Sequence, residues 1–135
     1  MDIVSHGILG ILFAKEVSLL AVAGGLFPDI DKLYTLAKGR YRREDSRTWF
    51  QEPPFLSFVV VAGFLLGIPA FSLGVISHYF IDFITGSTRP FNPFNKKVID
   101  FNLSIPQKIA LGAVIWFIGA AVFMDWIKLP RLFQL

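Results

Sequence analysis

Two histidines and a few aspartates in this 135-residue chain recur at spacings that suit metal binding. His78 and Asp82 are four residues apart inside an apolar stretch, so on a helix they share one face. Imidazole nitrogen and carboxylate oxygen are ligands of zinc-like ions, and the same two groups also form plain hydrogen bonds between helices. Because an aspartate among phenylalanines is costly without a partner, we expect one of these interactions.

Two further pairs offer the same chemistry. Asp2 and His6 are also four residues apart, although they equally suit an exposed terminal acid and a histidine that packs between helices. Asp29 and Asp31 follow Gly24-Gly25 at the end of an apolar stretch. Their carboxylates could bind a hard cation, or they could simply form the polar turn that begins a loop. Spacing alone leaves both alternatives open.

The composition predicts that these residues are carried by membrane helices. The chain is 54% apolar and 17% charged, whereas soluble domains are about 45–50% apolar and about 25% charged. Residues 54–84 contain one charged residue, Asp82, and residues 109–124 contain none. Uncharged apolar runs of about 18 residues or more are transmembrane candidates. We therefore expect an integral membrane protein whose main partner is the lipid bilayer.

The first apolar stretch, residues 3–27, has two interpretations. A single helix would be long enough to span, but it would place Lys15-Glu16 near the bilayer centre at about 2.5–3.5 kcal/mol for each charge. Two short helices would place the same pair at the turn of a hairpin. We prefer the hairpin, which returns the chain to its starting side. It also brings His6 towards Asp29, two residues that a straight helix would separate by about 35 Å.

The stretch 54–85 is too long for one ordinary span, and Gly67-Ile68-Pro69 interrupts it. The predicted fold is an all-α, polytopic membrane helical bundle of about five helices, forming one domain over residues 1–135 with short helical hairpins at 3–27 and 54–85. The predicted helices are about 3–14, 17–27, 54–67, 70–85 and 107–127, with polar loops at 28–53 and 86–106.

The distribution of cations predicts the orientation. Ten of the thirteen Lys and Arg residues lie in or beside the two long polar loops, six in the first and four in or just after the second. By the positive-inside rule, these loops and the N-terminus are cytoplasmic and the C-terminus is outside the inner (cell) membrane. In a soluble protein such a basic cluster would suggest nucleic acid; beside membrane helices we expect no nucleic-acid partner. There is no cysteine, which excludes thiolate chemistry.

Several motifs together resemble one family. They are Ser5-His6-Gly7, the segment Leu26-Phe27-Pro28-Asp29-Ile30-Asp31, and the segment Gly74-Val75-Ile76-Ser77-His78-Tyr79-Phe80-Ile81-Asp82-Phe83-Ile84-Thr85. In this order and spacing they resemble the YdjM-like family, small bacterial and archaeal inner-membrane proteins described as metal-dependent hydrolases. The resemblance covers roughly residues 1–125. It implies a site around a divalent metal ion, zinc or similar, built from His6, Asp29, Asp31, His78 and Asp82.

One feature departs from the family pattern. Members typically carry a further histidine-bearing motif in the loop after Asp31, whereas residues 41–50 here contain no histidine, and Thr48-Trp49 stands where Thr-His is expected. The departure leaves open a second hypothesis, a non-catalytic scaffold or accessory subunit of a membrane protein complex, or a homo-oligomer, with a degenerate site. A transporter is a third alternative, which no internal symmetry supports.

The hydrolase hypothesis assigns roles to further residues. The resemblance implies that Asp31 acts as the catalytic base, at a site on the cytoplasmic interface. An ester or phosphoester of a lipid is the expected substrate there. Arg42, Arg43 and Arg47 are candidates for contacts to its phosphate or to a partner protein.

Overall fold

The computed structural model describes residues 3–30, 37, 39, 52–88, 99–100 and 103–124. Its elements, in chain order, are α1 (Ile3–Ala14), α2 (Leu19–Leu26), the 3-10 helix η1 (Phe27–Asp29), α4 (Pro53–Leu65), α5 (Pro69–Thr85), β1 (Ser87–Thr88), β2 (Ile99–Asp100) and α6 (Ile105–Phe123). The prediction of an all-α fold with five α-helices is confirmed for this part of the chain. The predicted loop 86–106 also contains a short antiparallel pair, β1 with β2.

Both predicted helix breaks are present. Helix α1 ends before Lys15, whose positive φ of 54° stops the right-handed helix, and Ser18 caps α2 by accepting a hydrogen bond from the Ala21 backbone N–H at 3.2 Å. Gly67, with a φ of 71°, separates α4 from α5, and Pro69 opens α5, where its missing N–H costs nothing. The 3–27 and 54–85 segments therefore each form two helices.

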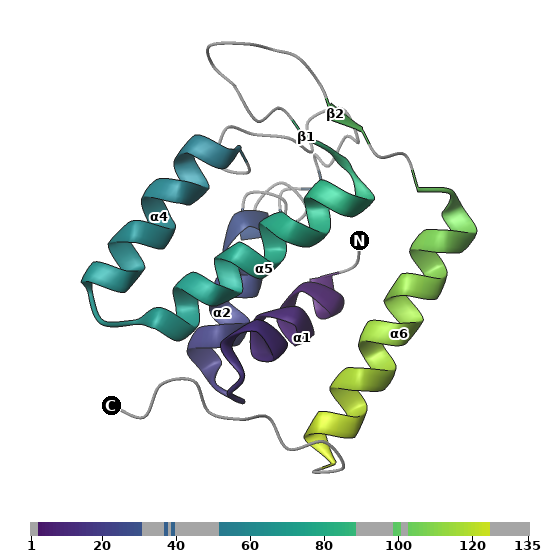
Figure 1. Ribbon diagram of the computed structural model, residues 1–135, viewed down its shortest axis with the longest axis horizontal. Coiled ribbons are helices and arrows are strands. Elements are labelled where there is room, and N and C mark those ends of the chain that lie inside the picture. Colours follow the sequence, from purple (N-terminus) through teal and green to yellow (C-terminus); the bar gives the residue numbers. More distant parts are fainter. Residues whose placement is uncertain are drawn as a thin grey trace.

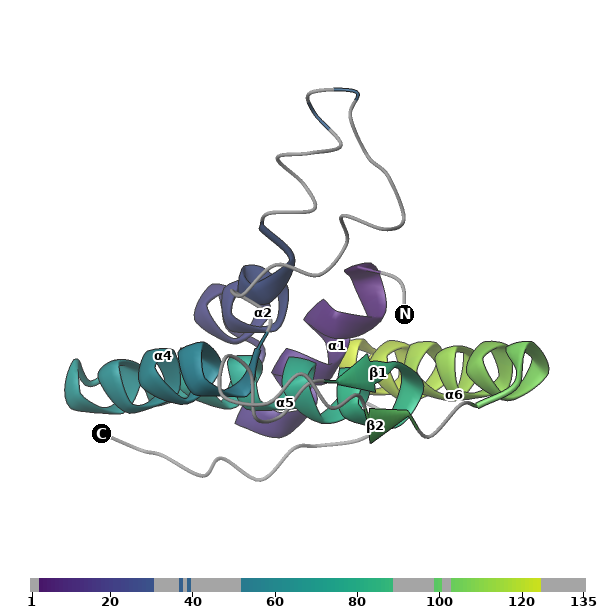
Figure 2. The same ribbon diagram turned by 90° about the horizontal axis from the view of Figure 1, so that it is seen from above.

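Helices α1, α2 and α5 pack against one another and form the centre of the molecule. Helix α4 packs on α5, and α6 contacts α1 on the other side (Figure 1). Seen from above, α4, α5 and α6 lie in one layer, and α2 lies to one side of it (Figure 2).

Glycines allow the central helices to approach closely. A Cβ atom at Gly74 of α5 would lie 2.7 Å from the backbone nitrogen of Gly25 in α2. A Cβ atom at Gly25 would in turn overlap the backbone carbonyl of His6 in α1. Small residues at such contacts are typical of helices that associate without a hydrophobic driving force. These contacts also bring the N-terminal part of α1, the end of α2 and the later turns of α5 together.

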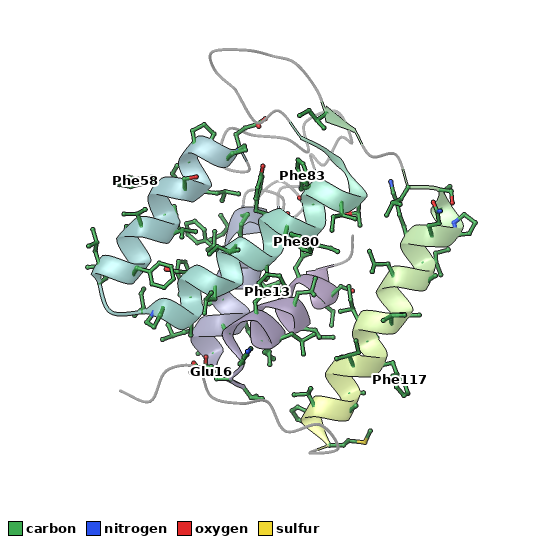
Figure 3. The ribbon with its side chains drawn as sticks, in the orientation of Figure 1. Phe13, Glu16, Phe58, Phe80, Phe83 and Phe117 are labelled. Atoms are coloured by element: carbon green, nitrogen blue, oxygen red, sulfur yellow. The ribbon has the colours of Figure 1, made fainter. Side chains whose placement is uncertain are left out.

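Helix α6 is the one helix, among the described residues, that is long and apolar enough to cross a membrane. It begins at Ile105, two residues earlier than predicted, because Ser104 and Gln107 form a capping box. Its side chains are mostly exposed, and Phe117, like Phe58 of α4, points away from the bundle (Figure 3). The predicted extension of this helix to residue 127 lies outside the described residues.

Candidate metal centre

His78, in α5, is oriented by the end of a neighbouring helix. Its Nδ1 lies 2.7 Å from the backbone carbonyl oxygen of Gly25. That carbonyl is one of the last four of α2, which have no partner within their own helix. Because a carbonyl only accepts, Nδ1 carries the hydrogen and donates it. In the neutral ring, Nε2 is therefore left with a free lone pair.

His6, in α1, is oriented by a buried carboxylate. Its Nδ1 lies 3.0 Å from Oδ2 of Asp29, which belongs to the 3-10 turn that follows α2. Pro28 lacks the N–H that would continue α2, so the chain tightens at this point and Asp29 is turned into the core. An ionised carboxylate accepts the Nδ1 hydrogen, and the lone pair of the imidazole is again on Nε2.

The two Nε2 atoms converge on one carboxylate. The rings of His6 and His78 lie 4.0 Å apart between centroids. The His6 Nε2 is 3.6 Å from Oδ1 of Asp82, and the His78 Nε2 is 3.4 Å from its Oδ2. Both nitrogens are buried, and neither has a hydrogen-bond partner in the described part of the chain. Distances of 3.4 Å and more exceed those of well-formed hydrogen bonds, so the nitrogens are close to Asp82 without bonding to it.

The ligand atoms of His6, His78 and Asp82 fit a divalent ion. All of them lie within 4.8 Å of one another. Two atoms that bind zinc tetrahedrally, each at about 2.0–2.1 Å, are themselves about 3.4 Å apart. The distance from His78 Nε2 to Oδ2 of Asp82 is 3.4 Å, and that from His6 Nε2 to Oδ1, the other oxygen of the same carboxylate, is 3.6 Å, so both are close to that value. Two nitrogens and one oxygen, with a further position left for water or substrate, are also the ligand set of catalytic zinc sites.

The groups behind the two histidines fit the same interpretation. Histidines that bind metals almost always donate their other ring N–H to a carboxylate or to a backbone carbonyl, which fixes the ring and its tautomer. His6 meets a carboxylate and His78 meets a carbonyl, so both kinds of support occur here. The predicted ligand Asp29 is thus placed behind His6, although its Oδ1 is also 3.8 Å from the His78 Nε2.

The candidate centre is closed on most sides and open at Asp82. The side chains of His6, His78 and Asp29 are at most 3% exposed, whereas that of Asp82 is 22% exposed. A small molecule would therefore reach the ligand atoms past Asp82.

The remaining predicted residues lie outside the described residues. These are Asp2, Asp31, Arg42, Arg43 and Arg47. The predicted catalytic base and the predicted phosphate contacts stay predictions. The hydrogen bond from His78 to the Gly25 carbonyl was not predicted, because every residue has a backbone carbonyl and the residue type does not show which one accepts. Its signal in the sequence is the position of Gly25 in the last turn of a predicted helix.

Comparison of the chain with protein-family profiles, with curated proteins and with solved structures gives no match. The resemblance to the YdjM-like family therefore stays a prediction.

Proposed function

We propose that this chain is a multi-pass membrane protein with a divalent metal centre, held by His6, His78 and Asp82, that carries out hydrolysis at the membrane interface. One observation carries the proposal. The buried Nε2 atoms of His6 and His78 have no hydrogen-bond partner in the described part of the chain, although both face the Asp82 carboxylate. The Nδ1 atom of each ring is already hydrogen-bonded. Buried polar atoms are rarely left in this state, and a metal ion would satisfy all of them at once.

The distribution of polar and apolar side chains supports a membrane location. His6, His78 and Asp29 are among the most buried residues, at 0%, 1% and 2% exposure, whereas Leu19 and Leu65 are exposed by 85% and 83%. A water-soluble monomer rarely exposes large contiguous apolar surfaces. In a bilayer, the exposed leucines and phenylalanines of α4 and α6 would contact lipid, and the polar residues would be shielded from it.

The short helices support a proposed placement of the centre at one side of the bilayer. At 1.5 Å per residue, the 12 residues of α1 extend about 18 Å, less than the hydrocarbon thickness of about 30 Å. The α1–α2 hairpin would therefore enter the bilayer and return to its starting side. His6 lies near the start of α1, Asp29 just after α2, and Asp82 near the end of α5, so the proposed centre faces that side. In the sequence, the cation-rich segments follow Asp29 and Thr85, and the positive-inside rule makes the side from which they begin cytoplasmic.

The residues around the centre have separate roles in the proposed reaction. A divalent ion bound there supplies Lewis acidity and activates water near neutral pH. Asp29 and the Gly25 carbonyl hold the two imidazoles in the tautomer that binds. The partial exposure of Asp82 gives the substrate its approach. Asp31 remains the proposed base, and Arg42, Arg43 and Arg47 the proposed contacts for the phosphate of a lipid phosphoester.

The alternative function is a scaffold in which the His–Asp cluster only joins helices. A proton on each Nε2 atom would then replace the metal, and hydrogen bonds near 2.7–3.0 Å would connect these atoms with the Asp82 carboxylate. The contacts of 3.6 and 3.4 Å favour the metal instead.

Hydrolysis of a nitrophenyl phosphodiester by the detergent-purified protein tests the proposed function. We expect turnover that is lost on chelation and restored by zinc, and that falls to background in His78→Ala. Glu16→Gln is the matched control, since it removes a carboxylate at the far end of α1. Metal-independent turnover, or equal turnover in His78→Ala and wild type, would contradict the proposal.

A further inference from the structure

An apolar cavity of about 270 Å³ lies between α1 and α6. Its walls include Ile8 and Leu12 from α1 and Trp116, Ala120 and Phe123 from α6. None of the described residues that line it is charged. The close contact of Gly119 with Ile8 holds the two helices together at this level. The cavity therefore offers a hydrocarbon surface between two helices that already touch.

A second cavity, of about 430 Å³, continues along the same helix towards its N-terminus. Its lining includes Thr85 of α5 and Lys108, Ile109 and Ala113 of α6, and it shares Trp116 with the first cavity. We call the two together the α6 groove. The shared tryptophan makes them neighbours along α6.

The two ends of the α6 groove differ in polarity. Among the described residues of its lining, Lys108 is the one that carries a charge, and it lies in the first turn of α6. Thr85, opposite it, is three residues after Asp82 and therefore on the same side of α5. The cationic end of the groove is thus lined in part by the turn of α5 that follows Asp82, whereas the described lining of the apolar end comes from α1, Val17 and α6.

The α6 groove is long enough for a lipid chain. From Lys108 to Phe123 the helix rises about 22 Å at 1.5 Å per residue. One leaflet of a bilayer contributes about 15 Å of hydrocarbon, half of the usual thickness of about 30 Å. An acyl chain of about that length, with its headgroup near Lys108, would extend along α6 past Trp116 towards Phe123. The ammonium group of Lys108 complements the negative charge of a phosphate.

We propose that the α6 groove binds one acyl chain of a phospholipid, with the lipid phosphate beside Lys108, and so presents a headgroup phosphoester to the metal centre. This inference rests on the proposed hydrolase function and specifies its substrate class. Hydrolysis would add one water: its hydroxyl forms the new P–O bond, the P–O bond to the departing alcohol breaks, and that alcohol takes the remaining proton. Chain and headgroup are thus recognised by different parts of α6.

Photocrosslinking in vesicles tests the inference without requiring turnover. The probe is a phosphatidylglycerol with a diazirine in its acyl chain, and the crosslinked positions are mapped by mass spectrometry. We expect labelling of Ile8, Leu12, Trp116 and Ala120 to exceed several-fold that of Phe58 on α4, which serves as the reference for bulk lipid. Even labelling of all apolar exposed positions, or crosslinks to a second copy of this chain, would overturn the inference.

Two variants with controls sharpen the result. Ala113→Trp fills the α6 groove and is expected to abolish the enrichment, whereas Val114→Trp, on the neighbouring exposed position outside the groove lining, keeps it. Lys108→Gln is expected to lower labelling by phosphatidylglycerol but not by diacylglycerol with the same chain, which has no phosphate. Loss of enrichment in both tryptophan variants, or an equal effect of Lys108→Gln on both probes, counts against the inference.

Metal content of the same samples separates the two proposals. Bound metal together with even labelling would contradict lipid binding in the α6 groove but not the proposed hydrolase. Enriched labelling in protein that binds no metal would contradict the proposed hydrolase but not lipid binding in the α6 groove.

Discussion

His6 of α1 and His78 of α5 lie with their rings 4.0 Å apart, and both direct Nε2 to the carboxylate of Asp82. Each ring is held from behind by a different group, Asp29 for His6 and the Gly25 carbonyl for His78. Both supporting groups come from α2 and the turn that follows it. Helix α2 therefore orients the two imidazoles, although it supplies none of the three ligand atoms that lie together.

Removal of metal should lower the stability of the folded protein. An ion that binds the native state alone stabilises it by about 2.7 kcal/mol at a concentration one hundred times its Kd. Thermal unfolding in detergent, followed by circular dichroism, should show a lower Tm after chelation and recovery with zinc. The His6→Ala, His78→Ala double variant should show neither change. A Tm of the wild type that is indifferent to chelator and zinc would contradict the prediction.

Asp29→Asn separates support from ligation. The amide oxygen still accepts the Nδ1 hydrogen of His6, but the charge that strengthens this bond is lost. Loss of such supporting partners typically costs about 10–100-fold in metal affinity. Competition with a chromophoric chelator should show that Asp29→Asn binds one zinc per chain about 10–100-fold more weakly than the wild type does.

The comparison is Asp82→Asn, which replaces a direct ligand and should weaken zinc more than Asp29→Asn does. If Asp29→Asn had the larger effect, Asp29 would be the ligand and Asp82 the supporting group.

Gly74→Ala should destabilise the central helix packing. Its Cβ would overlap backbone atoms of α2, which cannot move aside as a flexible side chain can. Overpacking of this kind costs about 1–3 kcal/mol. Gly7→Ala is the matched control, because its Cβ would make an ordinary contact of 3.5 Å with Val22. Unfolding in increasing concentrations of denaturing detergent should rank Gly74→Ala well below Gly7→Ala, and equal stabilities would refute the packing argument.

Lys15→Gly should stabilise the α1–α2 turn. Lys15 adopts a left-handed φ of 54°, which costs a residue with a side chain about 1–2 kcal/mol and costs glycine little. The neighbouring substitution Glu16→Gly, at a residue without a positive φ, should not raise the Tm. A lower Tm for Lys15→Gly would show that the lysine side chain contributes more than the strain costs.

The main helices could be predicted because their breaks have strong local signals. The charged pair Lys15-Glu16 and the sequence Gly67-Ile68-Pro69 both stop a helix for reasons that need no tertiary contact. The earlier start of α6 was also readable, since Ser104 and Gln107 have the spacing of a capping box. The β1–β2 pair was missed, because two residues are too few to form a periodic pattern.

The sequence predicted that His6, His78 and Asp82 lie together, whereas the roles of the site residues stay predictions. The i,i+4 spacing placed His78 and Asp82 on one face, and the hairpin brought His6 to them. The position of Asp29 behind His6 depends on the 3-10 turn at Pro28, whose direction no spacing rule gives. The α6 groove could not be predicted from the sequence, because it depends on where α6 contacts α1. In the sequence its apolar residues look like those of any lipid-facing helix.

The most direct test of the account is the zinc content of the detergent-purified protein, measured by mass spectrometry of the elements beside the His6→Ala, His78→Ala double variant. We expect close to one ion per chain in the wild type and almost none in the variant. Equal content in the two proteins, whether zero or one, would contradict a metal centre built on these histidines.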